Sequence, residues 1–241
     1  MKELYFSELD STNTYLKEHY EELEDMCFVR ADYQSAGKGR NSRRWLADRN
    51  VNLTFSLLIR NEEVIKRYKA LSVLSAYSVL EVLKDYGIND LMIKWPNDIY
   101  AGNEKICGIL LESVAREKIE CLIIGIGINV NQMEFNDSYL IRPTSMKKCL
   151  GKDIDIEELK DRVYSKLSEN IEALLKEHDF YEEIRSFDYL KGRRAEAYLD
   201  GDRKEVEIIG MTEDYSLEIR SEGVIRKIES GEITFHQGVY Q

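Results

Sequence analysis

Several features are missing from this sequence of 241 residues, and each absence removes a class of protein. No apolar run approaches the roughly 20 residues that a membrane-spanning helix requires. The first residues lead directly into strand-like sequence, without the pattern of a signal peptide. Internal repeats and low-complexity segments are absent too. We therefore expect a globular protein with no membrane partner.

The cysteines form no recognisable framework. There is no C-x-x-C pair and no neighbouring histidine cluster around any of the four, which are Cys27, Cys107, Cys121 and Cys149. Such scattered cysteines are typical of buried free thiols rather than of disulfides or zinc ligands. This pattern favours a cytoplasmic protein.

The net charge of −11 argues against general affinity for nucleic acid, which depends on neutralising phosphates with Lys and Arg. The charge is uneven, however. Residues 30–49 hold six basic side chains against two acidic ones, whereas residues 151–190 hold six basic against twelve acidic. A basic loop on an acidic protein can be a solvated surface segment. With two glycines inside it, the loop favours a small polyanion such as a nucleotide triphosphate.

Hydrophobic periodicity predicts an α+β fold with a mixed sheet. Strands are expected at residues 4–9, 27–33, 51–59, 91–95, 98–101, 105–114 and 119–130. Helices are expected at residues 12–23, 64–87 and 155–186. After residue 193, short strand-like runs alternate with turn signals at residues 200–202, 213–215, 222–223 and 230–231. We predict one main domain over residues 1–189 and a small β-barrel over residues 190–241.

The segment Lys94-Trp95-Pro96-Asn97-Asp98 gathers a cation, an indole, an amide and a carboxylate between two strands. Proline lacks an N–H and restricts the preceding residue, so the strand should stop or bulge there. One interpretation is a tight turn that uses Asn and Asp for local hydrogen bonds. The other is a pocket wall, and this segment alone does not decide between them.

Four further segments occur in a fixed order with the Lys94–Asp98 turn. They are Ser11-Thr12-Asn13 before a helix, the glycine- and cation-rich loop 34–45, Lys105 ahead of Gly108-Ile109-Leu110, and the strand end Gly125-Ile126-Gly127-Ile128-Asn129-Val130-Asn131. In this order and spacing the set resembles the biotin protein ligase family. The resemblance runs from residue 10 to residue 131, and the tail after about residue 190 also looks like the small C-terminal domain of that family.

The resemblance implies a class II synthetase-like catalytic domain, an SH3-like C-terminal barrel and a two-step reaction. Biotin would be activated with ATP and Mg²⁺ to biotinoyl-5′-AMP, then transferred to a lysine of a biotin carboxyl carrier protein, most simply that of acetyl-CoA carboxylase. Many members carry an N-terminal DNA-binding domain before the Ser-Thr-Asn element. Only ten residues precede that element here, so we expect the ligase-only form, with no nucleic-acid partner. Members often pair through an edge strand, which makes a homodimer an expectation as well.

The resemblance also assigns candidate site residues. Those expected at biotin are Ser11, Thr12, Asn13, Gln34, Gly37, Lys38, Gly39, Arg40, Lys105 and Gly108. Those expected at the nucleotide are Arg43, Trp45, Lys94, Trp95, Asn97, Asp98, Asn129 and Asn131. Asp98 is the candidate Mg²⁺ ligand, and Lys105 and Arg40 are the candidate catalytic cations.

Several of these residues also have a structural interpretation. Ser11, Thr12 and Asn13 suit a helix N-cap as well as a ureido ring. Lys105 could be an exposed lysine after a hairpin turn, and Trp45 a core aromatic rather than a stacking face for adenine. For Trp95, the sequence supports equally a direct polar role and packing, either in the core or against the apolar parts of a ligand.

The loop departs from the family pattern. Most members have arginine at position 38, and a second arginine and a glycine at positions 41 and 42. Lys38 keeps the charge but not the bidentate fork of arginine, and Asn41 and Ser42 make the loop less cationic.

Two rival functions remain open at this point. A lipoate protein ligase would share the fold and the adenylation chemistry, whereas a non-catalytic sensor of biotinoyl-adenylate would share only the fold. The polar Ser-Thr-Asn element favours biotin over lipoate, because a dithiolane needs no polar partners. The intact Lys105 and cationic loop argue against a sensor.

Overall fold

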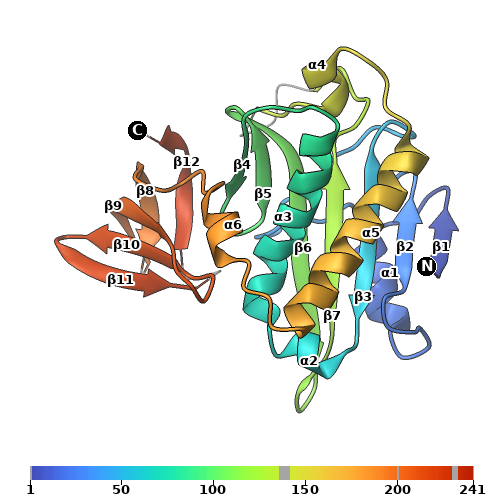
Figure 1. The fold of residues 1–241 in the computed structure, drawn as a ribbon, viewed down its shortest axis with the longest axis horizontal. Helices are drawn as coiled ribbons and strands as arrows, with labels where there is room; N and C mark the ends of the chain where they lie inside the picture. The colour runs from blue at the N-terminus through green and yellow to red at the C-terminus, as the bar shows by residue number, and fades with distance from the viewer. Residues whose placement is uncertain (1, 136–141, 200, 230–232, 241) are drawn as a thin grey trace.

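The computed structural model describes residues 2–135, 142–199, 201–229 and 233–240, and Figure 1 shows its two β-sheets. The larger sheet has seven strands in the order β1-β2-β3-β7-β6-β5-β4. These strands are β1 (Glu3–Phe6), β2 (Phe28–Ala31), β3 (Leu53–Ile59), β4 (Leu91–Lys94), β5 (Asp98–Ala101), β6 (Glu104–Ala115) and β7 (Ile119–Ile128). Only the β1–β2 pair is parallel, so this sheet is mixed, as the sequence predicts.

Helices cover the two faces of the large sheet unequally. The long helices α3 (Tyr68–Asp85) and α5 (Ile156–Leu175) pack together over one face, in front of the sheet in Figure 1. The short α1 (Thr12–His19) packs on β3, β7 and β2 from the other side. Because α1 is only eight residues long, it leaves part of that second face uncovered.

Strand alternation divides the core between these faces. Along β7, Leu122, Ile124 and Ile126 join the main core, which also holds most of the buried side chains of α3. Cys121 and Ile123 alternate with them and join a smaller cluster under α1. The next positions on the α1 side are glycines, and these matter for the site described below.

The second sheet is antiparallel, with the order β11-β10-β9-β8-β12. Its strands are β8 (Arg194–Leu199), β9 (Asp202–Met211), β10 (Leu217–Ser221), β11 (Val224–Ile228) and β12 (Ile233–Tyr240). This small β unit lies beside the β4–β5 edge of the large sheet and is reached through α6 (Tyr181–Arg185) (Figure 1). The turns expected at residues 213–215 and 222–223 connect its strands, and the one expected at 230–231 lies outside the described residues.

All three helix predictions are wrong in their extent. The helix expected over residues 12–23 ends at His19. The helix expected over residues 64–87 is two helices, α2 (Glu62–Ile65) and α3, separated at Arg67, whose φ of −100° and ψ of 24° are not helical. The helix expected over residues 155–186 ends at Leu175, and α6 follows after Glu177, which has a φ of 64°. The sequence also gave no sign of α4 (Met146–Leu150), a five-residue helix capped by Ser145.

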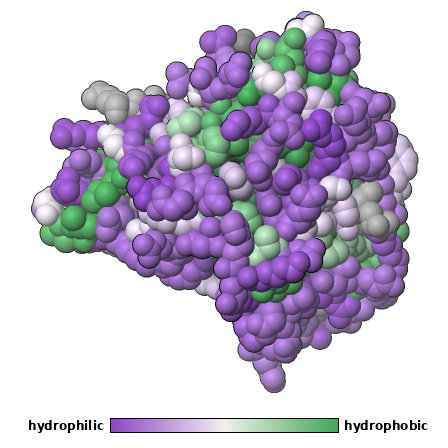
Figure 2. Space-filling model, in the orientation of Figure 1, coloured by the Kyte–Doolittle hydropathy of each residue, from purple (hydrophilic) through white to green (hydrophobic). Residues whose placement is uncertain are grey.

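The surface of the face in Figure 2 is mainly hydrophilic. A hydrophobic area lies at the β10–β11 end, where Val224 and Ile225 are 55% and 53% exposed. None of the helices in the described ranges is long and apolar enough to cross a membrane.

Candidate active site

A cavity of about 420 Å³ lies on the α1 side of the large sheet, next to the N-terminal end of that helix. Its floor is made of glycines on neighbouring strands, Gly108 on β6 and Gly125 and Gly127 on β7. A Cβ atom at Gly125 would lie 2.2 Å from Asn13 Oδ1, and one at Gly127 would lie 2.4 Å from Trp45 Cε2. The missing side chains therefore create the space in which α1 and the cationic loop meet the sheet.

One end of the cavity, here called the head end, is lined by the uncharged polar residues Ser11, Thr12, Asn13 and Gln34. Ser11 occupies the N-cap position of α1, but its side chain makes no capping hydrogen bond. The Thr12 N–H instead donates to Gln34 Oε1 at 2.8 Å. The N-cap interpretation therefore does not explain the Ser11 hydroxyl, which is buried and borders the cavity.

The cationic loop closes the cavity as a small hairpin. Trp45 N–H donates to Gly37 O at 2.9 Å, and Gly39 N–H donates to Arg43 O at 2.8 Å. Asn41 and Ser42 form its tip with φ values of 54° and 60°, the positive values that a two-residue hairpin turn of type I′ requires. The Trp45 indole lies on Gly127 and Gly108, so the loop is attached to the floor by an aromatic ring.

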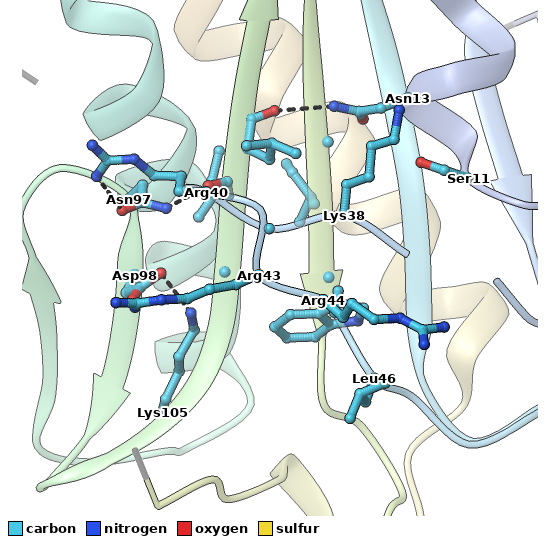
Figure 3. A pocket seen from close by; sticks show the side chains of 18 of the residues that line it. Ser11, Asn13, Lys38, Arg40, Arg43, Arg44, Leu46, Asn97, Asp98 and Lys105 are labelled. Carbon is cyan, nitrogen blue, oxygen red and sulfur yellow. Dashed lines mark hydrogen bonds and ion pairs between the residues drawn. The ribbon is translucent and has the colours of Figure 1, made fainter. Parts of the chain in front are cut away.

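The other end, here called the cationic end, contains Lys105 and the Lys94–Asp98 turn (Figure 3). Lys105 Nζ pairs with Asp98 Oδ1 at 2.7 Å. Arg40 Nη1 donates to Asn97 Oδ1 at 3.2 Å, while Asn97 Nδ2 donates to Ile109 O at 2.6 Å. The turn thus fixes the positions of two cations from different segments, which the local-turn interpretation does not require.

Burial changes the pKa values of two cations here. The pKa of Lys94 falls to about 8, because burial disfavours its ammonium and Lys105 and Arg43 repel it, although Asp98 opposes the shift. Burial also lowers the pKa of the Arg40 guanidinium. Six cations line the cavity against one carboxylate, Asp98, among the described residues: Lys38, Arg40, Arg43, Arg44, Lys94 and Lys105. An anionic ligand would relieve this repulsion.

Three residues that the sequence predicts at biotin or at the nucleotide instead make contacts within the protein. Gly37 lies outside the cavity lining, and a Cβ there would meet Trp45 O at 2.5 Å, so it closes the hairpin. Asn131 is also outside the lining, where its amide exchanges two hydrogen bonds of 2.9 Å with the main chain of Ile154. Trp95 borders the cavity but is only 5% exposed, and its indole N–H donates to Tyr215 O at 2.9 Å.

The other candidate residues all line the one cavity. Sequence reasoning missed several further lining residues, which include Arg44, Leu46, Phe55, Gly125, Gly127 and Pro143. The alternating glycines of Gly125-Ile126-Gly127 were a usable signal, because bare positions on one face of a strand mark a close approach. Pro143 carried no such signal; it lies in a segment whose main chain bonds both the N–H and the carbonyl of Lys105 at 2.9 Å.

The residues present do not fit a metal centre held by the protein. Asp98 is the only carboxylate among the described lining residues, and it is ion-paired with Lys105. No group of three or more His, Cys, Asp or Glu side chains suited to a metal occurs in the described ranges. Since Mg²⁺ in nucleotide sites is shared with phosphate oxygens, one carboxylate offers at most a single contact to it.

Comparison with known proteins is consistent with this geometry. Residues 5–129 match the model of the biotin/lipoate A/B protein ligase family. The bifunctional ligase/repressor BirA of Bacillus subtilis is 38% identical over 130 residues, which are 53% of this chain and 40% of that protein. The biotin--[acetyl-CoA-carboxylase] ligase of Mycobacterium tuberculosis is 32% identical over 106 residues, 42% of this chain and 38% of that protein. The matched region thus spans about two fifths of these relatives.

The structural similarity extends further along the chain. The structure of the biotin protein ligase from Aquifex aeolicus in complex with biotin and ATP superposes with a TM-score of 0.86 and 30% identity. That match covers 98% of this chain and 99% of the Aquifex chain, so it includes both sheets. The chain therefore belongs to the biotin/lipoate A/B protein ligase family.

Proposed function

We propose that this protein activates biotin with ATP and transfers it to a lysine of a biotin carboxyl carrier protein. The observation that carries the proposal is the pairing of an uncharged polar end and a cationic end in one cavity. The head end suits a ring with N–H donors and a carbonyl acceptor, such as a cyclic urea. The cationic end suits a carboxylate next to a polyphosphate.

The first step joins two anions. A biotin carboxylate oxygen attacks the α-phosphorus of ATP, a P–O bond forms, and pyrophosphate leaves. Lys105 and Arg40 reduce the repulsion between the two anionic reactants. They also stabilise the negative charge that develops on the phosphoryl oxygens. Mg²⁺ enters in this proposal only as part of the ATP substrate.

The second step consumes the mixed anhydride. The neutral ε-amine of a carrier lysine attacks the biotinoyl carbonyl carbon, AMP leaves with the bonding pair, and the amine loses its proton. The hairpin loop covers the cavity and limits the access of water to the anhydride. We favour the carrier of acetyl-CoA carboxylase as the acceptor. We favour the cytosol as the compartment in which the transfer takes place.

The transfer is tested by incubating the protein with biotin, ATP, Mg²⁺ and an isolated carrier domain. The expected result is a mass increase of one biotinoyl group on the acceptor lysine, and none on a carrier with that lysine replaced by arginine. Labelling by lipoate instead of biotin would favour the lipoate ligase alternative. Absence of labelling by either acid would contradict the proposal.

A further inference from the structure

Glu112 on β6 contacts the head end from outside the cavity. Its carboxylate accepts hydrogen bonds from Asn13 Nδ2 at 2.7 Å and from Lys17 Nζ. Both donors belong to α1 and are four residues apart, so they lie on one face of the helix. Burial alone would raise the pKa of Glu112, but the bonds from Lys17 and Asn13 hold it below its usual value. Glu112 is therefore a carboxylate that can only accept hydrogen bonds.

Glu112 sets the orientation of the Asn13 amide. Since a carboxylate cannot donate, the NH₂ group of Asn13 must face Glu112, with Leu110 O at 3.5 Å as a second and longer acceptor, and its Oδ1 then faces β3. There Ser56 Oγ donates to Asn13 Oδ1. Both Asn13 and Ser56 are buried, so a reversed amide would leave polar atoms without suitable partners.

The hydrogen-bond direction at Ser56 also decides whether the Thr12 hydroxyl donates or accepts. Since the Ser56 hydroxyl donates to Asn13, it can only accept from Thr12, so the Thr12 hydroxyl donates its hydrogen to Ser56 Oγ at 2.7 Å or to Gln34 Oε1 at 3.2 Å. Thr12 Oγ1 then offers only lone pairs to the cavity. Gln34 Oε1 accepts from the Thr12 N–H, which leaves the Gln34 NH₂ as a donor at the head end.

We propose that Glu112 is a positioning residue that fixes the hydrogen-bond direction of the head end through Asn13, Ser56 and Thr12. The head end then presents an acceptor at Thr12 and a donor at Gln34, which complement an N–H and a carbonyl in one ligand ring. This inference rests on the proposed function, because it assigns the ligand ring to biotin. Glu112 itself touches no ligand.

The test replaces Glu112 by glutamine, which keeps the shape but can also donate, so that the Asn13 amide can reverse. The measured quantity is kcat/KM for pyrophosphate release with biotin and with its oxazolidinone analogue, in which a ring oxygen that only accepts replaces the ureido N–H that would donate to Thr12. Glu112→Gln should lower the preference for biotin by about tenfold, the discrimination that one mispaired buried group provides. The KM for ATP should stay within about twofold of wild type, because the phosphate contacts are made at the other end.

Three comparisons separate positioning from a general loss of structure. Desthiobiotin keeps the urea, so its kcat/KM relative to biotin should not change in Glu112→Gln. Glu120→Gln is the matched control: Glu120 is also a strand glutamate that bonds the α1 segment, through Tyr20, but it has no contact with Asn13. Ser56→Ala breaks the same chain and should lower the same preference, with no further loss in the double variant. It also keeps the test open if Glu112→Gln does not fold.

The outcomes distinguish the two levels of the proposal. A wild-type protein without biotin-dependent pyrophosphate release would contradict the proposed function itself. An active wild type whose preference for biotin over the oxazolidinone analogue is unchanged in Glu112→Gln and in Ser56→Ala would overturn the role of Glu112 alone.

Discussion

Both the main chain and the side chain of Lys105 are held in place by neighbouring segments. Residues 142–144 bond its N–H and carbonyl, and Asp98 pairs with its ammonium at 2.7 Å. Lys105→Ala should therefore slow adenylate formation by about 10²–10³-fold, the usual effect of removing one preorganised charge contact, while the fold is kept. Biotin-dependent exchange of pyrophosphate into ATP measures this step.

The exposed Lys118, which pairs with Glu62 far from the cavity, is the matched control, and Lys118→Ala should be as active as wild type. Near-normal exchange by a folded Lys105→Ala protein would remove Lys105 from the catalytic role.

Lys94 should make the proposed binding of nucleotide depend on pH. Its pKa of about 8 lies below the ordinary 10.5, so between these values the folded protein has released a proton that the unfolded chain still holds. This group therefore adds stability as the pH rises through that window. Nucleotide phosphates favour the ammonium, so ATP binding at pH 9 should take up a proton.

Calorimetry of ATP binding at pH 9 in two buffers with different ionisation enthalpies tests this uptake. The apparent enthalpies should differ for wild type and agree for Lys94→Arg, because arginine stays charged. Equal enthalpies in both buffers for the wild type would show that Lys94 does not titrate with the ligand.

At the scale of elements, the hairpin loop combines internal hydrogen bonds with four exposed or half-buried cations, to which an anionic ligand would add counter-charge. The free loop should therefore open more readily than the loaded one. Trypsin should cut the free protein after Lys38, Arg40, Arg43 or Arg44, and biotin with ATP should suppress that cutting. Equal rates of cleavage with and without both ligands would contradict a lid.

Arg40 links this loop to the Lys94–Asp98 turn through Asn97. Arg40→Gly should therefore form adenylate more slowly, because one of the two cations is lost, and also release it, which would be seen as biotin on exposed lysines of a bystander protein. A variant that forms adenylate without such labelling would leave the loop with a structural role only.

The two sheets are joined at the wall of the cavity. The Trp95 indole donates to Tyr215 O, between β9 and β10, and Tyr181 donates its hydroxyl to Met211 O nearby. Trp95→Phe should lower the free energy of unfolding by about 0.5–1.5 kcal/mol for the lost bond and reduce kcat/KM for ATP, since the turn that carries Asn97 and Asp98 loses a support. Urea unfolding and exchange kinetics measure both effects; the Tyr181→Phe variant is the control, because it loses a similar bond away from the turn.

The sequence predicted which helices and strands occur better than it predicted the residues at which they end. The breaks at Arg67 and Glu177 escaped prediction because the apolar stripe continues across each of them and neither residue is a glycine or a proline. The site was predicted from residues with distinctive chemistry. What the sequence could not show is how those side chains are used. Asn131 and Trp95 bond the main chain of distant segments, and Glu112 contacts Asn13 only because β6 pairs with β7, on which α1 packs.

For the whole molecule, the charge distribution sets the choice of ligand. The protein carries a net charge of −11, yet its cavity is lined by six cations and one carboxylate among the described residues. This contrast favours small anions that fit the cavity over extended polyanions on the surface. On the proposed function, the uncharged head end would then select among the acids that are activated at the cationic end.

Biotin-dependent exchange of labelled pyrophosphate into ATP, measured with purified protein and no carrier, tests this account most directly. We predict exchange with biotin and none above background with lipoate, because only the urea ring satisfies the head end. Exchange driven by lipoate, or no exchange with either acid by a folded protein, would contradict the account.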